Sequence, residues 1–249
     1  MSDRNEETEY EFEPFELLFL HRREQIDRLV GVTGAALRSM NGAARLSEVL
    51  KKSAEHVDSI RSVEEAALAE IQADMPLIHG SATVLIWGAL EASVRDFVVR
   101  WLTRYPSARL SPDLKAVKVK VVEYEALAAE DRMRYLVGIL EREQGASLRP
   151  GVARFECLLA PFGIHVPLDA DNRRTLNELA AVRNVIVHRA GTADDRLIEL
   201  CPWLGLKTGQ EVKVGREAFL RYRSATSEFA AALIQAARPV SAQLLARSK

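Results

Sequence analysis

The stretch that decides the fold lies at residues 84–90 and reads Val84-Leu85-Ile86-Trp87-Gly88-Ala89-Leu90. It is apolar on every side, which is typical of a helix buried in a protein core. Pro76 suits the first turn of this helix, and Tyr105-Pro106 ends it. We therefore expect a long central helix over residues 76–104, around which the other elements pack.

Two helices are predicted before this core helix. Apolar residues recur at near-helical spacing over residues 15–38, Asn41-Gly42 interrupts the pattern, and a narrower apolar stripe follows over residues 43–73. Two such helices can form an antiparallel hairpin. We accordingly divide the chain into an N-terminal helical extension at residues 1–72 and a helical domain at residues 73–249.

The elements after the core helix are also expected to be helical. Helical patterns cover residues 113–129, 131–144, 152–159, 170–189 and 216–237. Pro239 is expected to kink or break the last of these helices. The alternation at residues 211–214, which read Glu-Val-Lys-Val, allows one short strand. The predicted fold class is therefore all-α, an antiparallel helical bundle with at most one short β element.

The composition excludes wholesale disorder and favours helices. Hydrophobic residues make up 48% of the 249 residues and charged residues 28%, as in an ordinary folded domain. Aromatic residues make up only 6%, which argues against sheets. The net charge of −1 gives no overall basic field, although a local basic cleft can still bind RNA.

No cofactor and no membrane segment are expected. Cys157 and Cys201 are too few and too separated for a disulfide framework or a zinc site. The first residues are acidic, unlike those of a secretory signal. The longest strongly apolar stretch, residues 82–90, is far shorter than the ~20 residues that cross a bilayer. We therefore expect a cytoplasmic protein that needs no metal or other cofactor.

The candidate functional residues lie near the end of the helix at residues 170–189. The segment reads Arg183-Asn184-Val185-Ile186-Val187-His188, and Gly191 follows as a helix terminator. At ~100° per residue, Arg183 falls near the middle of a broad apolar face, formed by Leu176, Leu179, Ala180, Ile186, Val187 and Ala190. A guanidinium among apolar side chains is costly to desolvate unless an anion meets it. Arg183 therefore requires a carboxylate or a phosphate as its partner.

Glu91 is the candidate carboxylate for Arg183. It lies in an apolar stripe of the core helix, with Trp87 four residues before it and Val94 three residues after it. The pair has two interpretations. It is either a buried ion pair that only holds two helices together, which the spacing alone favours, or a carboxylate that orients Arg183 toward a phosphate.

Asn184 and His188 are four residues apart and share a face of the helix beside the arginine. The pair places an amide, which can donate and accept, beside an imidazole, which can act as an acid or a base near neutral pH. A histidine is also favoured at a helix C-terminus by the helix dipole alone. Arg183 lies ~140° from His188 around the helix, so the three converge only if Arg183 reaches sideways.

The segment Arg183–His188 resembles the R-x4-6-H signature of the HEPN superfamily, often written R-N-x-x-x-H. Its surroundings also agree, with Leu176-Asn177-Glu178-Leu179 upstream, Gly191 just beyond, and Trp87-Gly88-Ala89-Leu90-Glu91 in the helix expected to pack against it. The resemblance covers about residues 75–237 and is nearest to stand-alone bacterial HEPN proteins with ribonuclease and defence functions. It implies an HEPN-like bundle for that part of the chain.

The resemblance also implies an activity, namely that of a metal-independent endoribonuclease. Members dimerise so that two motif helices form one composite cleft, which here implies a homodimer that acts on RNA. His188 would take the 2′-hydroxyl proton or protonate the leaving 5′-oxygen. Arg183 would stabilise charge on the phosphoryl oxygens, Asn184 would hold the phosphate or the imidazole, and Glu91 would support the arginine. A toxin or a stress or phage-defence effector of this kind implies an inhibitory partner protein or antitoxin.

Further basic residues lie around and after the motif. Arg189, Lys207 and Lys213 are candidates for RNA binding along a basic groove, although such charges are more often solvated surface. Trp203 is interpreted as a packed loop anchor rather than as a platform for stacking bases.

Two alternatives to a ribonuclease stay open at this point. The first is a non-catalytic HEPN-like module that uses the same cleft to bind a nucleotide, RNA or a protein. The second is a helical scaffold in which Arg183 and Glu91 only lock the core.

Overall fold

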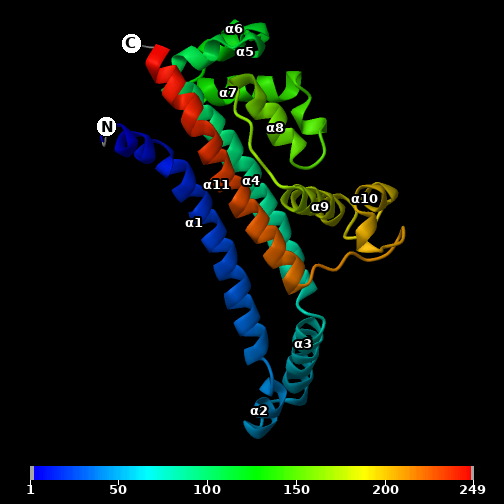
Figure 1. Cartoon of the computed structure of the whole chain (residues 1–249). Coiled ribbons are helices and arrows are strands. Elements are labelled where there is room, and N and C mark those ends of the chain that lie inside the picture. The colour runs from blue at the N-terminus through cyan, green and yellow to red at the C-terminus, as the bar shows by residue number, and fades with distance from the viewer. Residues whose placement is uncertain (1–2, 248–249) are drawn as a thin grey trace.

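The computed structural model is built of helices and their connections (Figure 1). It describes the backbone of residues 3–247 and the side chains of residues 19–129, 131–146 and 148–246. The α-helices are α1 (Asp3–Ser39), α2 (Ala43–Val49), α3 (Ala54–Gln72), α4 (Pro76–Arg104), α5 (Pro112–Ala116), α6 (Val121–Glu125), α7 (Ala129–Glu143), α8 (Ala153–Leu159), α9 (Ala170–His188), α10 (Asp195–Leu200) and α11 (Arg216–Arg247). The 3-10 turns are η1 (Pro106–Leu110), η2 (Ala146–Leu148), η3 (Ala160–Phe162) and η4 (Pro202–Leu204).

The all-α prediction is confirmed. Within residues 3–247, β structure is limited to an isolated antiparallel bridge between Thr192 and Glu211. That bridge falls at the first residue of the predicted strand at residues 211–214, and no strand forms beyond it in that segment.

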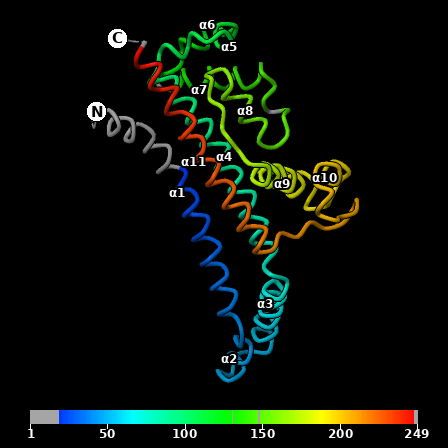
Figure 2. The backbone as a smooth tube through the Cα atoms, in the orientation of Figure 1, coloured from blue at the N-terminus to red at the C-terminus, as the bar shows by residue number. Residues whose placement is uncertain are grey.

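Three long helices, α1, α4 and α11, form the body of the molecule and lie side by side (Figures 1 and 2). In α4 the side chains of Ile86, Leu90, Val94, Val98 and Leu102 have no exposed area. They are spaced four residues apart and therefore form one buried stripe. Leu85 is 45% exposed, so the core helix is buried on most sides but not on all.

The start of α4 is fixed by side chains that bind free backbone N–H groups. The Oε1 atom of Glu70 accepts hydrogen bonds from the backbone N–H groups of Leu77 and Ile78, at 2.8 and 3.3 Å. Asp74 accepts a hydrogen bond of 2.6 Å from the backbone N–H of Arg216, where α11 begins. The two acids thus cap the first turns of both helices and hold these helix ends together.

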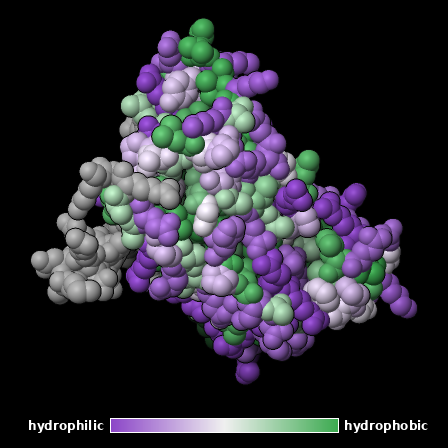
Figure 3. Space-filling view, turned by 45° about the horizontal axis from the view of Figure 1, so that its top comes forward, coloured by the Kyte–Doolittle hydropathy of each residue, from purple (hydrophilic) through white to green (hydrophobic). Residues whose placement is uncertain are grey.

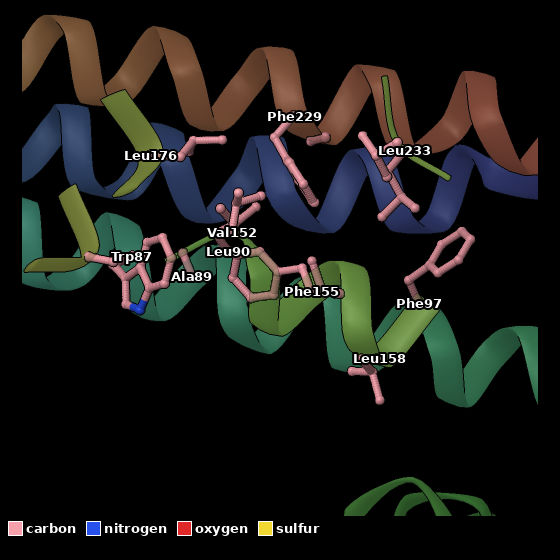
Figure 4. Packing of buried hydrophobic residues seen from close by; sticks show 14 of the residues in the cluster. Trp87, Ala89, Leu90, Phe97, Val152, Phe155, Leu158, Leu176, Phe229 and Leu233 are labelled. Atoms are coloured by element: carbon pink, nitrogen blue, oxygen red, sulfur yellow. The ribbon is translucent and has the colours of Figure 1, made fainter. Parts of the chain in front are cut away.

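A cluster of aromatic side chains joins α8 to α4 and α11 of the body. Phe155 of α8 packs against the rings of Trp87 of α4 and Phe229 of α11, in the cluster shown in Figure 4. The ring centroid of Phe155 is 5.2 Å from that of Trp87 and 5.4 Å from that of Phe229. Aromatic pairs at these separations contribute about 0.5–1.5 kcal/mol beyond the effect of the area that they bury. This packing positions the start of α8 beside α9.

The N-terminal helices depart from the prediction in two places. The helix expected over residues 43–73 is divided into α2 and α3, because Lys51 adopts a φ of 56° and Ser53 caps α3 by accepting a hydrogen bond from the backbone N–H of His56. The helix expected from residue 15 begins at Asp3.

The helix α1 is tied to the body through both core and charged contacts. Phe19 and Ile26 belong to the same core cluster as the apolar side chains of α4 and α11. Arg22 forms an ion pair with Asp96 of α4 at 3.3 Å, and Asp27 forms one with Arg223 of α11 at 2.7 Å. In Figure 1 the end of α1, with α2 and α3, extends past the other helices. The division into residues 1–72 and 73–249 stays a prediction.

Two other boundaries differ from the prediction. The helix expected over residues 113–129 consists of the single turns α5 and α6 with an irregular connection between them. The last helix continues through Pro239 to Arg247 instead of ending at residue 237. Ala237 and Ser241 are fully buried on either side of the proline, so packing holds the helix together despite the lost backbone hydrogen bond.

Two helices, α4 and residues 216–246 of α11, are long and apolar enough to cross a membrane by length and composition alone. More than half of the apolar window of α4 is buried inside the protein, as it is in the core helix of a bundle. Hydrophilic and apolar residues are interspersed over the face shown in Figure 3. The cytoplasmic location stays a prediction.

Candidate functional site

The predicted segment Arg183–His188 opens onto a cleft of about 690 Å³. The cleft is lined by α9, by residues 148–154 at the start of α8, by residues 189–200 after α9, and by Trp87 and Trp203. Arg183, Asn184 and His188 all contribute to its lining. The structure thus brings the three predicted residues together in one hollow.

The sequence of α9 explains why the hollow exists. The helix presents Arg173, Asn177, Asn184 and His188 to the cleft, with Ala180 and Ala181 in the middle. These positions recur every three or four residues and therefore share one face. The two small alanines leave open the space that larger side chains would fill.

The guanidinium of Arg183 is only partly satisfied. Its Nη1 atom donates a hydrogen bond of 3.1 Å to Oδ1 of Asn184. Its Nε atom is buried and has no hydrogen-bond partner within the described part of the chain. Because a guanidinium carries five N–H donors, most of its donors are free to bind an anion.

The predicted contact between Arg183 and Glu91 is wrong. Glu91 accepts a hydrogen bond of 2.6 Å from Nε1 of Trp87 and forms an ion pair with Arg154 of α8. The C-terminal part of α9 packs at the start of α4, since a Cβ on Gly80 would lie 3.7 Å from Ile186. Gly80 precedes Glu91 by eleven residues, about 16 Å along the helix. The carboxylate therefore supports Arg154 and not Arg183.

The apolar face of α9 is also placed differently from the prediction. Val182 and Val185 are buried, whereas Val187 is 45% exposed and Ala190 is exposed. Ala190 has a φ of 49° and lies beyond the helix, which ends at His188. Gly191, with a φ of 76°, donates its backbone N–H to the carbonyl of Val185 at 3.2 Å. A helical projection does not apply beyond this C-terminal turn.

His188 is the last residue of α9 and is exposed to solvent in the cleft. Its imidazole makes no hydrogen bond within the described residues, and Oδ1 of Asn184 is engaged by Arg183 instead. Both ring nitrogens of His188 are thus accessible to a ligand, and Asn184 does not fix the ring.

Arginine dominates the charge of the cleft. One acidic residue, Asp194, contributes to the lining beside six arginines: Arg149, Arg154, Arg173, Arg183, Arg189 and Arg196. Three of the arginines are paired, because Arg154 binds Glu91 and Glu141, Arg173 binds Glu156, and Arg189 lies 3.5 Å from Asp194. A cleft lined by charges of one sign attracts ligands of the opposite sign.

The other three arginines of the cleft, Arg149, Arg183 and Arg196, form no ion pair with the residues whose side chains the structure describes. They come from three separate parts of the chain, namely the segment before α8, α9 and α10. The cleft therefore offers unpaired positive charge from several walls, which suits an anionic ligand.

The wall formed by residues 148–154 is pinned to α9. Oδ1 of Asn177 accepts a hydrogen bond of 3.1 Å from the backbone N–H of Val152. Gly151 has a φ of 53°, and a Cβ built on it would overlap the same amide oxygen. Only glycine allows this close approach, which sets the position of Arg149 and Arg154 relative to the motif.

The proposed RNA-binding residues divide between the cleft and the surface elsewhere. Arg189 lines the cleft, whereas Lys207 and Lys213 do not. Lys213 forms an ion pair with Glu211 at 3.3 Å, and Lys207 is exposed. The two lysines lie on the irregular connection between α10 and α11, which Figure 2 shows running back to the start of α11.

Sequence reasoning did not identify Arg149, Arg154, Arg173 or Arg196 as residues of the site. The spacing of Arg173 from Asn177 and Asn184 was a usable signal, because these positions share the helix face of His188. The other three arginines carry no local signal, since they reach the cleft only through the packing of α8 and α10 on α9.

On its other side α9 carries a buried carboxylate, Glu178, which is 2% exposed. It accepts hydrogen bonds from the hydroxyl of Tyr222 at 2.8 Å, from Arg221 at 3.0 Å, and from Nε1 of Trp203. Burial, with a smaller contribution from the charge of Glu178, raises the pKa of the Cys201 thiol to about 11. The same two causes raise the pKa of Tyr222. Cys201 is thus a neutral, buried thiol rather than a nucleophile.

Comparisons with known proteins add no relative. No protein-family model, no curated protein and no solved structure matches this chain. Among the residues that the structure describes, no group of three or more histidine, cysteine, aspartate and glutamate side chains is placed to hold a metal ion. The cleft is therefore the feature from which a function can be inferred.

Proposed function

We propose that this chain is a metal-independent endoribonuclease of the HEPN type, which cleaves RNA through the 2′-hydroxyl next to the scissile phosphate. The observation that supports the proposal is the cleft itself. It contains Arg183, Asn184 and His188 together with five further arginines and one acidic residue. The unpaired arginines suit the phosphates of an RNA strand, and the accessible imidazole suits proton transfer.

The chemistry requires two proton transfers and no external nucleophile. The 2′-oxygen bonds to phosphorus while the bond from phosphorus to the 5′-oxygen breaks, leaving a 2′,3′-cyclic phosphate and a 5′-hydroxyl. His188 takes the proton of the 2′-hydroxyl or gives one to the 5′-oxygen. Arg183 donates to the phosphoryl oxygens as negative charge develops on them. Asn184, which accepts from Arg183, orients that guanidinium.

A second copy of the chain would complete the site. One imidazole cannot conveniently act as base and acid at the same time, and a symmetric dimer supplies two. Val187, next to His188, is 45% exposed and apolar, which fits an interface beside the cleft.

The variant Val187→Lys should convert a dimer to a monomer at micromolar concentration, as measured by light scattering. The control Val32→Lys, at a 61% exposed position on α1, should leave the dimer intact.

A monomeric wild-type chain at micromolar concentration would remove the composite-site part of the proposal.

A ribonuclease of this kind would act as a toxin or in stress or phage defence, and an inhibitory partner protein would keep its activity silent.

The decisive experiment compares the wild type with His188→Ala on single-stranded and structured RNA, with EDTA present throughout. We expect cleavage by the wild type with 2′,3′-cyclic phosphate ends, and a loss of about 10²–10⁴-fold in the variant. His165→Ala is the matched control, because His165 is exposed and lies outside the cleft. Its activity should equal that of the wild type.

A folded, dimeric wild type that cleaves none of these RNAs would overturn the ribonuclease. The alternative would then be a non-catalytic module that uses the same arginines to bind a nucleotide, RNA or protein. Thermal unfolding of His188→Ala serves as a second check, because an exposed catalytic residue should change stability little. A large loss of stability would assign His188 a structural role.

A further inference from the structure

Trp203 is a tryptophan at the surface of the cleft. It is 40% exposed, whereas Trp87 and Trp101 are 2% and 3% exposed. It lines the cleft together with Arg183 and His188, although it lies fifteen residues beyond the motif in the sequence. The interpretation of this residue as a loop anchor alone therefore omits the side that faces solvent.

Two contacts fix the orientation of the Trp203 ring. Its Nε1 atom donates a hydrogen bond to the buried carboxylate of Glu178. The guanidinium carbon of Arg174 lies 4.0 Å from the centroid of the ring, which is the geometry of a cation–π contact. Arg174 does not line the cleft, so the ring is braced from outside it. An exposed aromatic ring held in one orientation loses little conformational entropy when a ligand stacks on it.

The surroundings of Trp203 combine apolar surface with positive charge. Leu200, which is 40% exposed, and the buried Leu197 and Ala181 line the same cleft. Arg196, which has no ion-pair partner within the described residues, belongs to the same wall. An aromatic and aliphatic surface next to unpaired arginines matches a ligand that carries a flat apolar group and phosphates. The volume of about 690 Å³ lies within the range of small-ligand sites.

We propose that Trp203 stacks on a nucleobase of the bound RNA strand, on the ring face opposite Arg174, with Leu200 at its edge. This base subsite rests on the proposed function, because it assumes that an RNA strand occupies the cleft. It assigns to Trp203 the recognition of a base beside the phosphate that faces Arg183 and His188. The stack tolerates different bases, since each of them has a π-face.

The test measures binding of a labelled ten-residue oligodeoxynucleotide, which cannot be cleaved through a 2′-hydroxyl, and of the same strand without bases. Trp203→Leu should weaken binding of the base-bearing strand by about 5- to 150-fold, which corresponds to the ~1–3 kcal/mol of one base–aromatic stack. Binding of the abasic strand should change by less than about twofold. Trp203→Phe, which keeps an aromatic face, should retain most of the affinity for the base-bearing strand.

A matched control replaces an exposed apolar residue on another wall of the cleft. Leu148, which is 81% exposed, lines the cleft before α8, and Leu148→Ala should leave the ratio of the two affinities unchanged. Equal losses of Trp203→Leu for both strands would mean that the residue only shapes the cleft, and would overturn the proposal. An unchanged affinity for the base-bearing strand would overturn it as well.

The fluorescence of the wild type gives a readout that needs no variant. Trp203 supplies the emission that acrylamide quenches, since the other two tryptophans are buried. The base-bearing strand should quench or protect that emission at saturation, and the abasic strand should not. A bound base-bearing strand that leaves the emission unchanged would contradict stacking on Trp203.

The same assay separates an RNA strand from a free nucleotide. Adenosine 5′-monophosphate should displace the strand only at concentrations far above the dissociation constant of the strand. Displacement at equal concentration would replace the strand subsite by a nucleotide pocket. If Trp203 discriminates the two strands while the wild type cleaves no RNA, the base subsite holds and the proposed catalysis fails. If the wild type cleaves RNA and Trp203→Leu binds both strands normally, the proposed catalysis holds and the base subsite fails.

Discussion

Glu178 and Arg183 lie five residues apart on α9, and their surroundings differ: Glu178 is buried, whereas Arg183 is half-buried. Glu178, which is 2% exposed, accepts hydrogen bonds from Trp203, Arg221 and Tyr222. Arg183 makes one hydrogen bond, to Asn184, and its Nε atom is buried with no partner among the described residues. The carboxylate is saturated by the protein, whereas the guanidinium keeps donors that the protein does not use.

The difference separates a structural charge from one that is available to a ligand. A buried charge that every neighbour satisfies contributes to the specificity of the fold, and its removal strands its partners. A half-buried charge with unused donors costs stability in the free protein, and an incoming anion recovers that cost. The face of α9 that carries Glu178 therefore holds the bundle together, and the face that carries Arg183 is prepared for a ligand.

The largest expected effect on stability is that of Glu178→Ala. The substitution leaves the buried hydroxyl of Tyr222 without its acceptor and removes hydrogen bonds to a charged group, so the free energy of unfolding should fall by about 3 kcal/mol. Urea unfolding measures this. Glu199→Ala, at an exposed position of α10, is the control and should lie within about 0.5 kcal/mol of the wild type. A loss below about 1 kcal/mol for Glu178→Ala would remove the contrast between the two faces.

Gly151→Ala should destabilise the protein by about 2 kcal/mol, because the new Cβ overlaps the amide oxygen of Asn177 and the φ of 53° is unfavourable for alanine. Gly163→Ala isolates the backbone contribution, since Gly163 has a φ of 70° but open space around it. It should cost about 1 kcal/mol. Denaturant midpoints of the two variants give the comparison, and equal midpoints would show that Asn177 yields to the added methyl group.

The buried thiol of Cys201, which the charge of Glu178 on α9 influences, should resist ionisation at high pH. The pKa of Cys201 is raised from 9.0 to about 11 in the folded chain. The unfolded chain therefore binds fewer protons above pH 9, so stability falls as the pH rises toward 11. The contribution of this thiol should reach about 2 kcal/mol. The free energy of unfolding of wild type minus that of Cys201→Ala, measured from pH 8 to pH 11, should fall by this amount, and a constant difference would contradict it.

The smallest effect on stability is expected at Arg183. Arg183→Met removes a guanidinium whose Nε atom is unsatisfied, so the free energy of unfolding should rise or stay within about 1 kcal/mol of the wild type. Binding of the ten-residue strand should nevertheless weaken by roughly tenfold, as expected when one charge-assisted contact is lost. Arg45→Met, at an exposed position of α2 outside the cleft, should change neither quantity. A severe loss of stability for Arg183→Met would give the arginine a structural role.

The residues of the predicted site show what local periodicity can and cannot predict. Asn184 and His188 could be placed on one face from their spacing, and both line the cleft. The partner of Glu91 could not be predicted, because periodicity gives the helix face on which a residue lies but not the position along the helix at which two helices cross. The start of α4 packs against the end of α9, and α8 brings Arg154 to the carboxylate instead.

The sequence by itself determined the all-α class, the bounds of α4, most of the extent of α9, and the helix face that carries Asn184 and His188. These features follow from local periodicity, capping and breaking residues, which act over a few residues and are therefore visible in the chain. Only the tertiary structure decided which charges meet, how far α1 and α11 extend, and that arginines from three separate segments share one cleft with Trp203. Such contacts depend on how α8 and α10 pack on α9, and that packing is set by the shapes of side chains distant in the sequence.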